Sequence, residues 1–198
     1  MMLLPFNTKG CTAQADALQL YVGRKYDTAI ENATRIDFHY ALKSQTDDFL
    51  LVVLEAPHGP LGTHDYRIAL EAAPLEDGRT FLHLSYSYGF GAMSRMAMST
   101  YLATAGSEKV GFSSVKDDQG RPQLVRGVRG VVERNTMRYF LAIDAFLDSL
   151  STPAEARVDR RLRTWFESTQ RYPQQLHEMD YEQYVAMKRR EYSKLAAR

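Results

Sequence analysis

The hydrophobic pattern of this chain changes its period once, and this change constrains the fold more than any other feature. Through residues 18–88, apolar and polar residues alternate with a period of two, the pattern of strands that bury one face. From residue 92 onward, apolar residues recur every three or four positions, the pattern of amphipathic helices. The sequence therefore predicts an α+β protein in which the strands come first and the helices follow.

Five strands are predicted, at residues 18–23, 36–42, 49–54, 66–72 and 82–88. Asp77-Gly78 is the strongest signal of a tight turn, and two prolines and two glycines interrupt the pattern at 57–62. Because no helical pattern lies between these strands, we expect an antiparallel meander. One face of its sheet should be apolar and covered, and the other polar and open to solvent.

A long helix at residues 128–150 is the clearest helical element, and it is the expected cover for the sheet. The apolar positions predicted to share one stripe are Val128, Val132, Tyr139, Ile143, Phe146 and Leu150. A shorter helix is predicted at 92–104, with Met93, Met96, Ala97 and Tyr101 on one side. Residues 112–115 and 123–125 are predicted to form a small hairpin between the two helices.

We predict a domain boundary near Ser151, with one domain at 1–150 and a helical C-terminal extension at 151–198 packed on it. The extension has ten Lys or Arg and seven Asp or Glu residues, a net charge of +3, against −2 for the rest. Thr152, Pro153 and Glu155 are typical of a helix N-terminus with a capping box. The buried side predicted for the first helix of the extension is Val158, Leu162, Trp165, Phe166 and Thr169.

Motifs for covalent, metal or nucleotide chemistry are absent from the sequence. The single cysteine, Cys11, cannot form an internal disulfide, and the histidines lack the spacing of a zinc site. His39 and His83 are expected on the polar face of the sheet. The net charge of +1 over 198 residues does not favour nucleic-acid binding. We therefore predict no catalytic residue, metal or cofactor, and no nucleic-acid partner.

Aromatic side chains mark the apolar face of the sheet as the candidate binding surface. The rings expected on that face are Phe38, Tyr40, Tyr66, Tyr86 and Tyr88, opposite Tyr139 and Phe140 of the long helix. Large rings among smaller neighbours can enclose a cleft, and tyrosine hydroxyls can orient a ligand inside it. Ordinary core packing, with the hydroxyls at the rim, explains the same pattern and stays an alternative.

Arg134 and Arg138 lie one helical turn apart near the start of the long helix. Two guanidinium groups at this spacing could bind one anionic head group, so both are candidate ligand-binding residues. The alternatives are a solvated helix face and pairing with acidic residues of the extension or of the sheet edge.

Residues 62–67, 81–88 and 130–135, within a meander that ends in one long helix, resemble the START-like superfamily, also called SRPBCC or helix-grip proteins. The resemblance covers about residues 18–150. It implies a curved antiparallel sheet gripping the helix, with a cavity for a lipid, sterol-like or polyketide-like ligand. The sequence departs from the superfamily in its helical extension and in lacking the usual opening strand and helix pair. We expect a domain incomplete at its N-terminus, or one in which helix 92–104 helps to close the cavity.

Binding or transfer of a small hydrophobic ligand, without covalent chemistry, is the leading hypothesis. A polyketide-cyclase or aromatase-like enzyme is one alternative, and it requires a polar group inside the cavity. A protein-interaction domain, in which the helical extension docks a partner or a second copy in a homo-oligomer, is another. No segment has the roughly 20 apolar residues of a membrane span. As written the chain is expected in the cytoplasm, and an upstream signal segment would place it in the periplasm or outside the cell.

Overall fold

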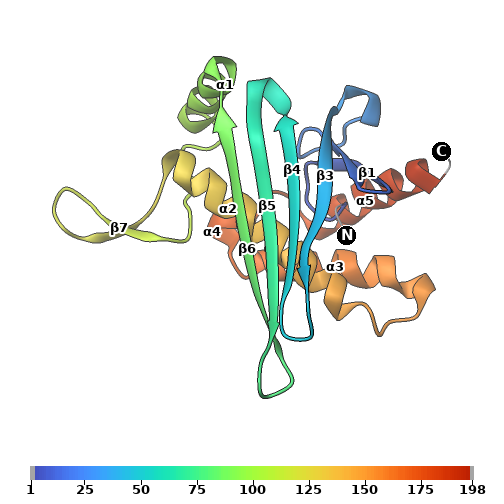
Figure 1. Ribbon diagram of the computed structural model, residues 1–198. Helices are drawn as coiled ribbons and strands as arrows, with labels where there is room; N and C mark the ends of the chain where they lie inside the picture. The colour runs from blue at the N-terminus through green and yellow to red at the C-terminus, as the bar shows by residue number, and fades with distance from the viewer. Residues whose placement is uncertain (1–2, 197–198) are drawn as a thin grey trace.

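Six strands form one antiparallel sheet in chain order, as the computed structural model of residues 3–196 shows (Figure 1). The strands are β1 (Thr8–Gln14), β2 (Ala17–Val22), β3 (Thr34–Gln45), β4 (Leu50–His58), β5 (Thr63–Pro74) and β6 (Thr80–Phe90). The five predicted strands are confirmed as β2–β6. A further strand, β1, precedes them and turns directly into β2. The predicted α+β class with an antiparallel meander is therefore confirmed.

Most of the helices lie on one side of this sheet, with the long helix crossing behind it, and the first helix lies at the end of β6 (Figure 1). They are α1 (Ala92–Ala103), α2 (Gly127–Asp148), α3 (Arg157–Gln170), α4 (Pro173–Leu176) and α5 (Tyr181–Ala196), with short 3-10 turns η1 (Ile30–Asn32), η2 (Pro60–Gly62) and η3 (Ala154–Ala156). The predicted small hairpin is confirmed as β7 (Ser114–Lys116) and β8 (Pro122–Leu124), which project away from the body.

The open face of the sheet is polar because charged side chains meet across neighbouring strands. Arg67 of β5 pairs with Glu55 of β4, and Nδ1 of His83 on β6 lies 2.5 Å from Glu71 of β5. His39 and His83 are exposed on this face, as the alternation predicts. Cross-strand pairs of this kind add little stability individually, but they keep the face compatible with water.

α2 is buried on two sides, and this corrects the single stripe predicted for it. Val128 is 41% exposed and Leu150 49% exposed, whereas Arg134, Arg138 and Ala145 are buried. One side of α2 meets the sheet and another meets the helical extension, so no single stripe describes its contacts. The core on the extension side comprises Leu4, Phe6, Leu141, Ala142, Ala145, Leu162, Trp165, Phe166, Leu176, Met179, Tyr184 and Met187.

The extension shares this core with the N-terminal segment. The ring centroid of Phe6 lies 5.0 Å from that of Trp165 and 5.3 Å from that of Tyr184. The predicted boundary near Ser151 falls in the turn between α2 and η3, and the division into two domains stays a prediction. Residues 1–2 and 197–198 of the predicted ranges lie outside the described residues.

The capping box predicted at the start of the extension is wrong. The segment begins with the η3 turn, whose N-cap is Pro153, and neither η3 nor α3 has a side-chain cap. A proline at the cap has no hydroxyl to offer, and the true helix starts four residues later than the motif indicates. The predicted buried side of α3 is largely confirmed, because Leu162, Trp165, Phe166 and Thr169 are buried.

A buried ion cluster joins the first strand to the last helix. The ammonium of Lys9 on β1 lies 2.9 Å from Glu191 of α5, and that of Lys188 lies 2.8 Å from the other oxygen of the same carboxylate. Backbone carbonyls of Phe6 and Pro5 accept further hydrogen bonds from the two lysines. Every ammonium is thus surrounded by oxygens, as buried charges require.

Candidate ligand-binding cleft

Two cavities lie side by side between the covered face of the sheet and α2. The first, here called the α1-end cavity, has a volume of about 260 Å³ and extends to α1. The second, here called the hairpin-end cavity, has a volume of about 460 Å³ and extends to the β1–β2 hairpin. Ile68 and Tyr139 line both, so they separate two parts of one cleft. Together these volumes suit a small molecule.

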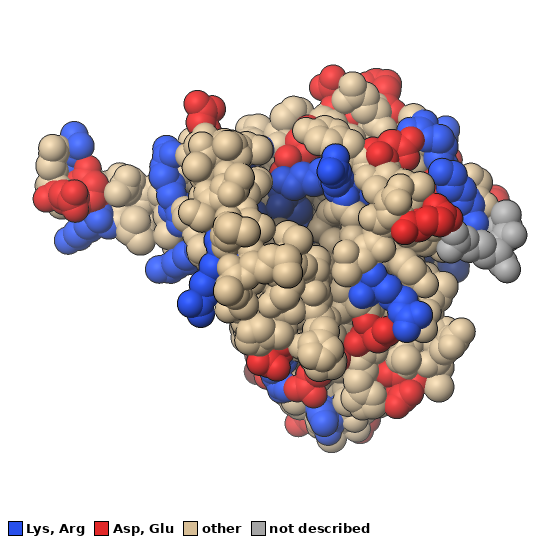
Figure 2. All heavy atoms as spheres, turned by 90° about the horizontal axis from the view of Figure 1, so that it is seen from above, with Lys and Arg blue, Asp and Glu red and all other residues tan. Residues whose placement is uncertain are grey.

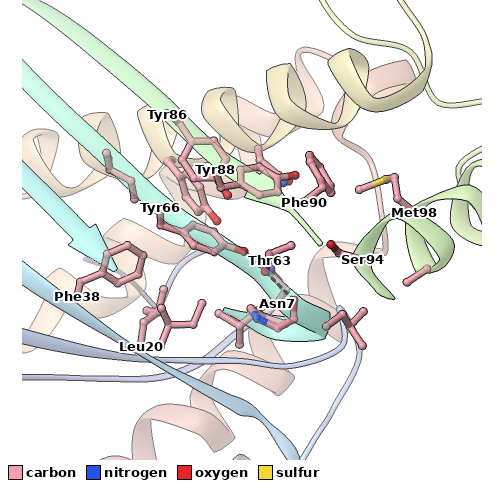
Figure 3. Close-up of a pocket in the computed structure, with 18 of the residues that line it drawn as sticks. Asn7, Leu20, Phe38, Thr63, Tyr66, Tyr86, Tyr88, Phe90, Ser94 and Met98 are labelled. Carbon is pink, nitrogen blue, oxygen red and sulfur yellow. Dashed lines mark hydrogen bonds between the residues drawn. The ribbon is translucent and has the colours of Figure 1, made fainter. Parts of the chain in front are cut away.

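Aromatic rings from the sheet and from α2 form one wall of the α1-end cavity (Figure 3). The ring of Tyr66 stacks on that of Tyr88, with centroids 5.1 Å apart and planes 9° apart. Tyr86 meets Tyr139 of α2 edge to face at 5.4 Å, and Phe38 meets Tyr66 in the same manner at 6.1 Å. These arrangements are favourable for aromatic pairs, so the wall is preformed.

The hydroxyls of Tyr66 and Tyr86 in this wall are hydrogen-bonded, and all the tyrosines of the wall stay protonated at neutral pH. Tyr66 donates to Oγ1 of Thr63 at 2.7 Å, and Tyr86 donates to the hydroxyl of Tyr139. Burial raises the pKa of Tyr66, Tyr86 and Tyr88 above the ordinary value, and it raises that of Tyr139 to about 12. At neutral pH these groups can donate or accept hydrogen bonds, but they cannot serve as general bases.

Small side chains create the space of the hairpin-end cavity. Ala13, Ala15 and Ala17 come from the β1–β2 hairpin, and Ala142 comes from α2. Larger residues at these positions would fill the cleft. Cys11 also lines this cavity, and burial raises the pKa of its thiol, so the thiol is not activated.

α1 and the η2 turn close the other end of the cleft. Ser94, Ala97 and Met98 of α1 line the α1-end cavity, as do Pro60 and Leu61 of η2. Figure 3 shows Ser94 and Met98 across the space from the tyrosine rings. The side predicted for α1 is right for Ala97 and Tyr101, which line this cavity, and wrong for the two methionines. Met93 and Met96 are exposed, because the helix meets the rest of the protein through the face that carries Ser94.

The close approach of two glycines holds α1 against η2. The Gly91 amide donates to the Gly62 carbonyl at 3.2 Å, and a Cβ on Gly91 would lie 2.7 Å from that oxygen. Leu61, beside it, has a φ of 56°, a left-handed conformation that is unfavourable for leucine. Such a conformation persists only where the surroundings impose it, so this end of the cleft has a defined shape.

Most of the predicted ligand-binding residues come together in the cleft. The α1-end cavity is lined by Phe38, Tyr66, Tyr86, Tyr88 and Tyr139. Tyr40 lines the hairpin-end cavity and is 40% exposed. Phe140, expected opposite the sheet rings, packs instead against the core shared with the extension. Binding by these residues stays a prediction.

The two predicted arginines line neither cavity. Arg134 is 2% exposed and donates to the Val110 carbonyl at 3.1 Å and to the Tyr101 hydroxyl at 3.3 Å. Arg138 pairs with Glu178 of the extension at 2.5 Å, which is one of the alternatives that the sequence left open. A solvated helix face is therefore wrong for both residues, because each is buried between α2 and its neighbours.

Several residues of the cleft were not singled out by sequence reasoning. Asn7, Thr63 and Asn135 add polar groups to the α1-end cavity. Thr63 and Asn135 lie in stretches quoted only for a resemblance of fold, and none of the three was named as a candidate site residue. Ala13 was a usable signal, because it pairs with Leu18 on the covered face of the hairpin, where a small residue leaves space beneath a helix.

Comparisons with known proteins add no relative to this description. Neither the scan against family models nor the searches of curated proteins and of solved structures finds a match for this chain. Among residues 3–196, no three or more His, Cys, Asp or Glu side chains gather as a metal site would require. Within the same part of the chain, every helix is too short or too polar to cross a bilayer.

Proposed function

We propose that this protein binds or transfers a small hydrophobic ligand, such as a lipid, a sterol-like or a polyketide-like molecule, in the cleft between the sheet and α2. The observation that carries the proposal is the pair of adjoining cavities, which are walled mainly by apolar and aromatic side chains. A few hydroxyl and amide groups lie among these side chains, as in sites that orient a ligand. On this proposal the chain is a START-like, helix-grip protein with an added helical extension.

A neutral apolar dye, N-phenyl-1-naphthylamine, tests this proposal directly. We expect its fluorescence to rise on binding to the wild-type protein. The Ala13→Trp variant should bind the dye at least about tenfold more weakly, because the indole would occupy the hairpin-end cavity. Thr12→Trp is the matched control, since Thr12 lies on the opposite face of the same strand and contacts Gln19 there. Equal dye binding by both variants would contradict the proposed site.

A carried ligand can also be detected without any probe. Native and denaturing mass spectra of protein purified without detergent are expected to differ by the mass of a small apolar molecule. Cys11 gives a second measurement, because it lines the hairpin-end cavity and is the only cysteine of the chain. A ligand in the cleft should slow the reaction of this thiol with Ellman's reagent.

The enzymatic alternative has no comparable support. It requires an acid or base inside the cleft, and neither His39 nor His83 lines either cavity. The cleft tyrosines have raised pKa values, so at neutral pH they are not ionised to act as bases, and they release a proton less readily as acids. An interaction role through the extension would have to use its charged outer surface, because Leu162, Trp165 and Tyr184 are buried in the shared core.

A further inference from the structure

Positively charged side chains gather behind the α1-end cavity, where α2, α1 and the extension meet. Arg134 and Arg138 of α2 are buried there, Lys25 lies over the Tyr101 ring at 5.8 Å, and Lys109 is partly buried nearby. Seen from this end, the molecule has a hollow with Lys and Arg atoms at its rim and inside it (Figure 2). We call these four residues the cation cluster.

The cation cluster has too little negative charge to balance it. Within residues 3–196, its ion pairs involve one carboxylate, that of Glu178. A single oxygen of Glu178 accepts from Lys25 at 2.6 Å and from Arg138 at 2.5 Å. Arg134 donates only to neutral oxygens, those of Val110 and Tyr101. A buried guanidinium without a counter-charge is costly, so the cluster is suited to receive an anion.

One donor of the cluster is buried without any acceptor. Nε of Arg138 has no hydrogen-bond partner in the described part of the chain, although the residue is only 6% exposed. Buried polar groups are nearly always hydrogen-bonded, so an unpaired guanidinium nitrogen indicates a place for an acceptor oxygen. Arginine binds carboxylates and phosphates through two adjacent nitrogens, and these anions supply such oxygens.

The cluster is in direct contact with the wall of the apolar cleft. Arg134 donates to the hydroxyl of Tyr101, and Nη1 of Arg138 lies 3.4 Å from Oδ1 of Asn135. Tyr101 and Asn135 both line the α1-end cavity. A ligand in the cleft could therefore place its apolar part against the tyrosine rings. Its charged end would then accept hydrogen bonds from Arg134 and Arg138, either beside the hydrogen bonds that these arginines donate to Tyr101 and Asn135 or in place of them.

From this juxtaposition we propose that the ligand is an amphiphile with an oxyanion head group, a carboxylate or a phosphate, held by Arg134, Arg138 and Lys25. This inference rests on the proposed function, because it assigns the polar end of a ligand whose apolar part lies in the cleft. Glu178 acts as a resident counter-ion that limits the affinity of the cluster for the head group.

Displacement of N-phenyl-1-naphthylamine by three decyl compounds tests the head group. Decanoate and decyl phosphate carry the two candidate anions, and decanol has a similar chain without charge. We expect at least one of the anionic compounds to displace the dye at about tenfold lower concentration than decanol, which corresponds to about one charge-assisted hydrogen bond. The tighter of the two then distinguishes a carboxylate head from a phosphate head.

Two variants should change the preference for the anionic compounds over decanol in opposite directions. Arg134→Met is expected to bring the anionic and neutral compounds to within about twofold of each other. Glu178→Gln is expected to increase the preference for the anion, because it removes the competing charge and keeps a similar shape. Arg129→Met is the matched control on the same helix, since Arg129 is exposed and pairs with Glu133. If the role of Arg134 is merely structural, Arg134→Met should weaken the binding of all three compounds equally.

The outcomes separate this inference from the proposed function. Equal displacement by decanol, decanoate and decyl phosphate would overturn the charged head group and leave the apolar cleft intact. Failure of the dye and of all three compounds to bind would overturn both. If inorganic phosphate raises the melting temperature as much as decyl phosphate does at the same concentration, the cluster holds a free anion and the amphiphile is wrong.

Discussion

Lys188 provides a prediction whose sign is unusual for a lysine in an ion pair. Its ammonium is completely buried, and it contacts Glu191 and the carbonyls of Pro5 and Thr8, each at 2.8 Å. Burial nevertheless dominates, and it lowers the pKa of Lys188 from its ordinary value of 10.5 to about 8. We therefore expect the substitution Lys188→Met to change how stability depends on pH.

The direction follows from proton linkage. The folded state binds the Lys188 proton less tightly than the unfolded state, so deprotonation favours folding. The cost of holding the charge is full below about pH 8, falls as the pH rises, and has vanished above about pH 10.5. With these pKa values the cost at neutral pH is about 3 kcal/mol, of which about 1 kcal/mol is recovered between pH 7 and pH 9.

Urea unfolding of wild type and Lys188→Met at pH 7, 8 and 9 measures this effect. The titrating groups outside the ion cluster are the same in both proteins, so the difference between the two curves reports Lys188 together with its coupling to Lys9 and Glu191. The free energy of unfolding of wild type should rise by about 1 kcal/mol relative to that of the variant over this range. Arg189→Met removes an exposed neighbour that is paired with Asp159, and its unfolding free energy should depend on pH in the same way as that of wild type. Parallel profiles for wild type and Lys188→Met, or a relative loss in wild type, would refute the reasoning.

Three further substitutions test other parts of the fold. Trp165→Ala removes a fully buried ring from the shared core and should cost about 3–5 kcal/mol in urea unfolding. Gly91→Ala places a Cβ 2.7 Å from the Gly62 carbonyl, so it should cost about 1–3 kcal/mol and speed hydrogen exchange in α1. Glu133→Ala removes the acceptor of the Phe112 and Ser113 amides, at 2.7 and 2.9 Å. Faster exchange confined to residues 112–125, with global stability lowered by less than about 2 kcal/mol, is expected there.

The sheet was predictable because each of its strands buries one face. The alternation at Ile36, Phe38 and Tyr40 reports directly which side is covered, and a short turn such as Asp77-Gly78 leaves the next strand only an antiparallel neighbour. β1 was harder, because Thr8-Lys9-Gly10 does not alternate and Lys9 is buried by its ion pair. A buried lysine looks like a solvent-facing one in the sequence.

The candidate site was predictable in its walls and not in its ends. Period two places Tyr66, Tyr86 and Tyr88 on the covered face, so their meeting follows from strand pairing. How α1 closes the cleft depends on the contact between Gly91 and Gly62, residues 29 positions apart in the sequence, which no local pattern encodes. Whether small residues leave a cavity likewise depends on how near α2 approaches the sheet.

The buried arginines show why hydrophobic periodicity does not predict the buried residues of a helix that is covered on two sides. Arg134 and Arg138 occupy polar positions of α2, and with the sheet as the only neighbour both would face solvent. Val110 and Tyr101 contact Arg134, whereas the extension covers Arg138 and brings Glu178 to it. This makes α2 at once the wall of the cleft and the inner layer of a second core. On the proposal of an anionic head group, the extension therefore completes the charged end of the cleft. Removing it would expose that core and leave Arg138 without its carboxylate, so loss of ligand binding on deletion would not by itself show that the extension contacts the ligand.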